Sequence, residues 1–237
     1  MTTQSRTREQ APRLGWAVPA GLVALSCIPL IAGTLRLLQL AGGPALIPAE
    51  ARFAEFPLAV ALHILGAATY VLLGVLQFVP QFRRRHRTWH RRTGRVLIVA
   101  RLLVAASALW MTLLYAAKPG TGDLLYALRL VFGCALIACL VLGFAAIRRS
   151  NTPAHRAWMI RAYAIALAAG TQAFTQGVGG ALFGTGELQG DLAQGAGWVI
   201  NLAVAEWVIR RPTRIRRRRR QVARPTQPSA TTVGARG

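Results

Sequence analysis

Cysteine is scarce in this chain, and its few cysteines lie at positions that do not favour disulfide bonds. The 237 residues include three cysteines, Cys27, Cys134 and Cys139, and all three lie inside apolar stretches. They show no CxxC spacing and have no partner cysteine in a loop. This pattern argues against a disulfide framework, so we expect the three thiols to behave as small hydrophobic groups in helix packing.

Common catalytic motifs are absent as well. The sequence contains no GxxxxGK[ST], no GxGxxG after a strand, no HExxH and no G-x-S-x-G. Nucleotide hydrolysis, dinucleotide chemistry and the common zinc-protease and serine-hydrolase reactions therefore have no support. We predict no catalytic residue; whether the chain is an enzyme stays open, with a non-enzymatic role favoured.

Acidic residues are the third scarcity. Seven Asp and Glu stand against 29 Lys and Arg, which gives a formal net charge of +22. The positive charge lies in short segments beside apolar stretches and not on the face of a soluble domain, so we expect no nucleic-acid partner. We predict anionic phospholipid headgroups at the cytoplasmic face as the partner, because each Lys or Arg beside a membrane adds about 1 kcal/mol of attraction.

Long apolar runs fill most of the remaining sequence. Six such stretches stand out, at residues 15–40, 56–79, 96–117, 124–147, 158–175 and 196–209. A helix of about 20 apolar residues crosses the hydrocarbon core of a bilayer. The sequence therefore predicts an all-α, six-helix transmembrane bundle over residues 15–209. It follows a cytoplasmic segment, 1–14, and precedes a basic, largely disordered cytoplasmic tail, 210–237.

The basic residues are sorted by loop. Of the 29 Lys and Arg, 24 lie in segments 1–14, 80–95, 148–161 and 210–237, whereas the three intervening loops hold only Arg52 and Lys118 against five acids. Positive charge is retained on the cytoplasmic side during insertion. Both termini are therefore predicted to be cytoplasmic. We expect the glycine-rich segment 177–197, near the outer side, to be a flexible or re-entrant connection.

Two cytoplasmic turns carry similar motifs, "RRRHRTWHRRTGR" after the second stretch and "HRAWMIRA" after the fourth. Together with a histidine near the start of a helix that ends in "GVLQFVP", they resemble the predicted bacterial membrane proteins of the domain of unknown function 2306 family. The resemblance covers about residues 58–176. It implies a multi-pass protein of the bacterial cytoplasmic (inner) membrane, and it brings no ligand, activity or catalytic residue.

Polar side chains recur inside the stretches at helical spacing, which places them on inward-facing stripes. Several fall at a similar depth toward the outer side, and they predict a pocket for a small acidic or lipid-like ligand formed by Arg36, His63, Tyr70, Arg129, Gln172 and Gln176. No carboxylate lies at that depth, so Glu50 or Glu55, backbone carbonyls or the ligand must balance the arginines. In the alternative interpretation, Arg36 and Arg129 extend independently to the headgroups.

Two charged groups toward the cytoplasmic side predict a structural ion pair. Arg101 lies within two turns of the inner end of its helix, and Glu206 is the only carboxylate in any of the six stretches. A proton relay through Glu206 is the alternative.

Histidines near the cytoplasmic turns leave further alternatives open. Seven arginines surround His86 and His90, which argues against a divalent metal, and we predict no metal site. We predict no cofactor either, but haem b held between His90 and His155 is the alternative, because membrane b-type cytochromes hold iron between histidines of different helices. The alternative functions are therefore a haem-binding redox protein and a structural or assembly factor that engages anionic lipid.

Overall fold

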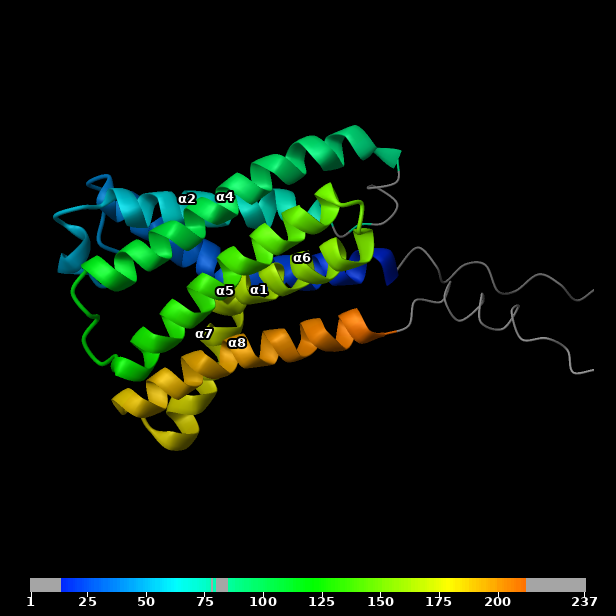
Figure 1. The fold of residues 1–237 in the computed structure, drawn as a ribbon. Helices are drawn as coiled ribbons and strands as arrows, with labels where there is room; N and C mark the ends of the chain where they lie inside the picture. The colour runs from blue at the N-terminus through cyan, green and yellow to red at the C-terminus, as the bar shows by residue number, and fades with distance from the viewer. Residues whose placement is uncertain (1–13, 78, 80–84, 212–237) are drawn as a thin grey trace, which may run out of the picture.

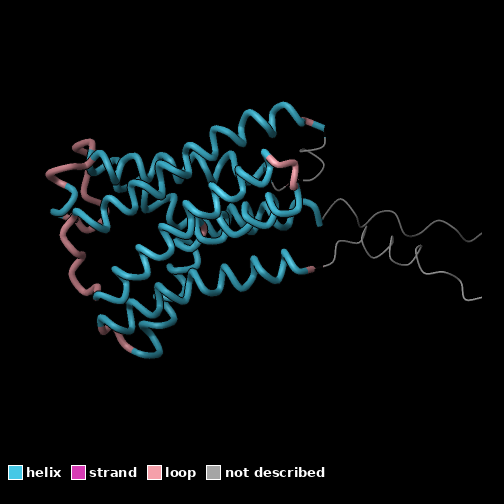
Figure 2. The backbone as a smooth tube through the Cα atoms, viewed as in Figure 1, coloured by secondary structure: helices cyan, strands magenta, loops and turns pink. Residues whose placement is uncertain are grey.

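The computed structural model describes residues 14–77, 79 and 85–211, and all the regular structure in these residues is helical (Figures 1 and 2). The elements are α1 (Leu14–Leu40), the short 3-10 helix η1 (Ala51–Phe53), α2 (Leu58–Gln77), α4 (Arg87–Leu114), α5 (Asp123–Arg148), α6 (Thr152–Ala166), α7 (Ala168–Phe183) and α8 (Glu187–Arg210). The all-α prediction is confirmed. The predicted segment 1–14 and tail 210–237 lie almost wholly outside the described residues.

Five of the described helices are long and apolar enough to cross a membrane: α1 from Ala20 onward, α2, α4, α5 and α8. They correspond to the first four predicted stretches and the sixth. The fifth stretch, 158–175, differs, because the chain there forms two shorter helices, α6 and α7, that meet at Leu167. A single continuous fifth helix was therefore the wrong prediction.

The glycine-rich segment 177–197 is helical over most of its length, which corrects its prediction as a flexible or re-entrant connection. It comprises the end of α7, a turn at residues 184–186 and the start of α8. Gly184 ends α7 with φ of 85°, a backbone conformation that glycine adopts without strain. Glu187 then begins α8, where a carboxylate is favourable beside the partial positive charge of a helix N-terminus.

The chain connections gather at the two ends of the bundle (Figures 1 and 2). One end holds the starts of α1, α4 and α6 and the ends of α5 and α8, and we call it the basic end because exposed arginines such as Arg85, Arg149 and Arg210 lie there. The other end holds the connections 41–57, 115–122 and 184–186. We call it the acidic end, because it carries Glu50, Glu55, Asp123, Glu187 and Asp191.

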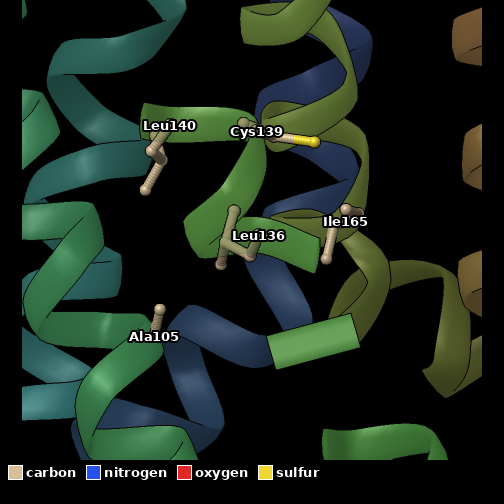
Figure 3. Close-up of a cluster of buried hydrophobic side chains, with 6 residues drawn as sticks. Ala105, Leu136, Cys139, Leu140 and Ile165 are labelled. Atoms are coloured by element: carbon tan, nitrogen blue, oxygen red, sulfur yellow. The ribbon is translucent and has the colours of Figure 1, made fainter. Parts of the chain in front are cut away.

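Helix α6 lies at the centre of the bundle. Its residues Ala162, Tyr163, Ala164 and Ile165 are all buried, and four consecutive buried residues mean that the helix is covered on every side. The main apolar cluster joins α6 to α4 and α5 (Figure 3). Its members are Ala105, Leu136, Cys139, Leu140, Ala162 and Ile165.

The outer surface of the bundle is apolar. Large hydrophobic side chains such as Leu72, Val131 and Phe183 point outward, with 64%, 60% and 74% of their surface exposed. Soluble monomers rarely expose apolar surface on this scale. Helices that face lipid do so, because hydrocarbon chains solvate these side chains and the helices satisfy their own backbone groups.

Candidate functional site

Three arginines lie at the acidic end, and we call them the acidic-end arginines: Arg36 on α1, Arg52 on η1 and Arg129 on α5. Arg36 Nη2 donates to Glu50 Oε1 at 3.1 Å, and Arg52 Nε donates to Glu50 Oε2 at 2.6 Å. The centroid of the Phe53 ring lies 5.5 Å from the guanidinium carbon of Arg36 and 4.6 Å from that of Arg52. One carboxylate therefore serves two arginines.

Arg129 has no hydrogen bond or ion pair to any described residue within normal bonding distance, although it is partly buried. Its electrostatic neighbours are Arg52, Asp191 and Glu50. Asp191 is 1% exposed and already accepts hydrogen bonds from the backbone N–H groups of Gly122 and Leu125, at 3.1 and 3.0 Å. Asp191 caps the start of α5, so Arg129 interacts with Asp191 and Glu50 through space and not through a direct ion pair.

The six residues of the predicted pocket contact different neighbours. His63 Nδ1 lies 3.1 Å from the Val104 carbonyl and 3.3 Å from Ser107 Oγ, in the contact between α2 and α4. Gln172 donates to the Gln194 carbonyl at 3.0 Å and so ties α7 to α8, whereas Gln176 is exposed. The structure therefore gives His63 and Gln172 packing roles and leaves Arg36 and Arg129 at the acidic end.

The structure pairs Glu206 with Arg161 and not with Arg101, which corrects the predicted ion pair. Arg161 Nε donates to Glu206 Oε1 at 2.5 Å and Arg161 Nη2 to Oε2 at 3.1 Å, while Arg210 Nε lies 3.6 Å from Oε2. Arg161 and Glu206 come from neighbouring helices, α6 and α8, at the basic end. Depth alone could not show which of Arg101 and Arg161 pairs with Glu206. The partner depends on which helices are neighbours.

Arg101 instead lies against aromatic rings in the interior. Only 3% of it is exposed, and its guanidinium carbon lies 3.3 Å from the centroid of the Tyr70 ring. Tyr70 packs in turn against Tyr163 of α6, with the two ring centroids 5.2 Å apart. A buried cation over an aromatic face gains about 2 kcal/mol or somewhat more, whereas burial of a charge costs several kcal/mol. The tyrosines therefore offset only part of the cost.

The break between α6 and α7 is held by a side chain that the sequence reasoning missed. Asn201 of α8 donates to the Ala164 carbonyl at 3.1 Å and accepts from Thr171 Oγ1 at 2.8 Å. It thereby bridges the last turn of α6 and the first turn of α7, and satisfies a backbone carbonyl beside the break. The sequence signal that could have identified it is an asparagine within an apolar stretch, because such a residue needs a polar partner inside the bundle.

His90 and His155 lie in the first turns of α4 and α6, at the basic end. His155 Nδ1 lies 2.8 Å from the Gly143 carbonyl, so this nitrogen donates to a backbone acceptor and the other ring nitrogen carries no proton when the ring is neutral. Within the described residues, no group of three or more His, Cys, Asp and Glu side chains could hold a metal ion.

The model of the DUF2306 family, described as a predicted membrane protein, matches residues 60–209 of the chain. This range covers more than half of the chain. The chain belongs to the DUF2306 family. No curated protein and no solved structure matches it.

The DUF2306 match covers some of the arginines and not others. Arg101, Tyr70, Tyr163 and Asn201 lie within the matched residues, and so does Arg129, whereas Arg36, Glu50 and Arg52 precede them. The centre of the bundle therefore lies in the part of this chain that corresponds to the DUF2306 family, and the Arg36–Glu50–Arg52 group lies outside it.

Proposed function

We propose that the chain crosses the bacterial cytoplasmic membrane six times, with both termini in the cytoplasm. Five crossings are the helices long enough to span, and α6 with α7 forms the sixth as one interrupted crossing. The 24 Lys and Arg in segments 1–14, 80–95, 148–161 and 210–237 support a cytoplasmic position for the basic end. This face is then the one expected to bind anionic phospholipid headgroups.

Cysteine labelling tests the orientation. In a variant with Cys27, Cys134 and Cys139 replaced by alanine, single cysteines at Pro48, Thr121 or Glu187 should react with a membrane-impermeant maleimide in intact cells. Single cysteines at Thr88 or Asn151 should react only after the membrane is opened. Reaction of the Thr88 variant in intact cells would reverse the orientation.

We further propose that the acidic end binds a small acidic or lipid-like ligand. The observation that carries this proposal is the pairing of the acidic-end arginines: Arg36 and Arg52 share one carboxylate, and Arg129 forms no ion pair with a described carboxylate. A partly buried guanidinium presents N–H donors that match a carboxylate or phosphate group. The ligand would supply the second anion of this group.

A groove beside the acidic-end arginines favours an amphiphilic ligand. It has a volume of about 290 Å³ and lies between the segment that carries η1 and the end of α4; its lining includes Arg52, Phe56, Trp110, Leu114 and Tyr115. The Tyr115 hydroxyl donates to the Phe56 carbonyl, and desolvation raises the pKa of this phenol, so it stays neutral. The apolar walls suit an acyl chain, and Arg52 lies at the groove to meet an acidic headgroup.

Native mass spectrometry of the purified protein tests this binding. An acidic molecule of defined mass should stay bound to the wild type, and Arg129→Gln should reduce its occupancy at least about tenfold, because loss of a charged hydrogen-bond partner costs more than about 1.4 kcal/mol. Arg149→Gln, at an exposed arginine of the basic end, is the matched control and should keep the ligand. Equal occupancy in all three proteins would contradict the proposal.

A haem-binding redox function is the second candidate, and the orientation of His155 favours it. A histidine whose Nδ1 donates to a backbone carbonyl keeps its neutral Nε2 unprotonated and able to bind a metal, which is the tautomer that many metal-binding histidines use. If haem b binds between His90 and His155, membranes with overproduced protein should show a Soret band that is lost in His155→Ala. The absence of that band would reject the haem-binding function, and the acidic-ligand proposal and the lipid-engaging structural role would stand.

A further inference from the structure

Two buried nitrogen atoms have no hydrogen-bond partner among the described residues, Arg101 Nε on α4 and Gln77 Nε2 on α2. Both are N–H donors, so both require an acceptor. Buried polar groups in proteins nearly always have such a partner. The interior of this bundle therefore has unmet donors beside a full positive charge.

The acidic residues of the described chain are used elsewhere. Glu50 binds Arg36 and Arg52, and Glu206 binds Arg161 and Arg210. Asp191 caps α5, and the three remaining described carboxylates, Glu55, Asp123 and Glu187, are exposed at the acidic end. The anion that balances Arg101 is therefore not a carboxylate of residues 14–77, 79 or 85–211.

We propose that Arg101 binds a small inorganic anion of halide size within the bundle. The charge of the site is set by the guanidinium, which is 3% exposed and stacked on Tyr70. The small size follows from the packing, because the rings of Tyr70 and Tyr163 lie in contact next to the guanidinium. A monatomic anion needs only a small space beside these rings, whereas an organic acid needs a larger cavity.

Gln77 indicates the route by which the anion arrives. It follows Tyr70 by seven residues on the same face of α2, about 10 Å nearer to the basic end. The arginines of that end concentrate anions at its surface. Toward the acidic end, Gly66 packs closely on the Ala100 carbonyl and the Val104 side chain, which closes the contact between α2 and α4. The unmet donor of Gln77 therefore lies between the basic end and Arg101.

Chloride-dependent stability tests the site. The full chain in nanodiscs of phosphatidylcholine is unfolded by heat, with Trp fluorescence as the readout, while sodium chloride replaces sodium gluconate at constant ionic strength. The unfolding midpoint of the wild type should rise with chloride and reach a plateau, because an anion that binds only the folded state stabilises it by mass action. Arg101→Gln should lose this dependence.

Two further variants locate the anion. Gln77→Leu should raise the half-effective chloride concentration about threefold or more, the loss expected for one hydrogen bond, and it carries the test should Arg101→Gln fail to fold. Arg129→Gln should keep the wild-type dependence. A wild-type midpoint that ignores chloride, an unchanged half-effective concentration in Gln77→Leu, or loss of the dependence in Arg129→Gln alone would each overturn the site at Arg101.

Discussion

The arginines at the ends of the bundle and the arginine at its centre are balanced in different ways. Arg36, Arg52 and Arg161 each bind a carboxylate, and their side chains are 12%, 17% and 26% exposed. Arg101 is 3% exposed, and its described neighbours include Tyr70, whose ring packs in turn on Tyr163, but no carboxylate bound to it. These three partly exposed arginines are thus matched by carboxylates of the chain, whereas the fully buried guanidinium is not. The comparison shows that burial and carboxylate pairing do not go together in this bundle.

Removal of one carboxylate should have the largest effect on stability. Glu50→Gln leaves two partly buried arginines without a counter-charge, and we expect it to lower the free energy of unfolding by about 2 kcal/mol, less than the 3–5 kcal/mol of a fully buried pair. Arg101→Met removes a charge that has no partner, so in gluconate it should change that free energy by less than about 1 kcal/mol. Denaturant unfolding of both variants in detergent measures the contrast. The opposite order would mean that Arg101 is balanced within the chain.

Asn201→Ala should cause the next largest loss of stability. It removes the donor to Ala164 and the acceptor of Thr171, and hydrogen bonds between membrane helices contribute about 0.6 kcal/mol each, so a loss of about 1 kcal/mol is expected. Thr171→Val removes one of the two bonds and should lose about half as much. Equal losses in the same unfolding assay would show that the bond to Ala164 contributes nothing.

The ion pair at the basic end should contribute less. Glu206 is 30% exposed, and exposed pairs contribute up to about 1 kcal/mol, so Glu206→Gln should lower the free energy of unfolding by about 0.5 kcal/mol at low salt. This loss should shrink at 1 M salt, where the interaction is screened. A loss that does not depend on salt would identify a packing effect instead.

Substitution of the two glutamines of the predicted pocket should have the smallest effects on stability, and the two effects should differ. Gln172→Ala removes the bond to the Gln194 carbonyl and should lose about 0.6 kcal/mol. Gln176 is exposed, so Gln176→Ala should change stability by less than about 0.3 kcal/mol. Comparable losses in the two variants would indicate a shared polar site after all.

Hydropathy predicted the helical architecture, but it did not predict the break between α6 and α7. The run of apolar residues from Trp158 onward looks continuous, because Leu167 is as apolar as its neighbours and no proline marks the interruption. The asparagine that holds the break lies on another helix, α8. Local periodicity carries no information about such a long-range bond.

The candidate site was predicted in parts. Stripe and depth identified Tyr70, Arg101 and Arg129 as polar groups inside the apolar stretches, and the structure buries the first two. They did not show which helices are neighbours. α2 packs on α1 and α4, whereas α5 packs on α4, α6 and α8, so His63 and Arg129 at similar depth belong to different contacts. Neighbour order depends on packing between helices, which one sequence does not reveal.

Asn201 also determines the order in which the bundle can be completed. Its partner at Ala164 is made 37 residues earlier, so α6 leaves the ribosome with a carbonyl whose interior partner does not yet exist. In hydrocarbon an unsatisfied carbonyl costs several kcal/mol, which opposes early settling of α6 and α7 in a lipid environment. The centre of the molecule therefore closes only when α8, the last of the described helices to be synthesised, arrives.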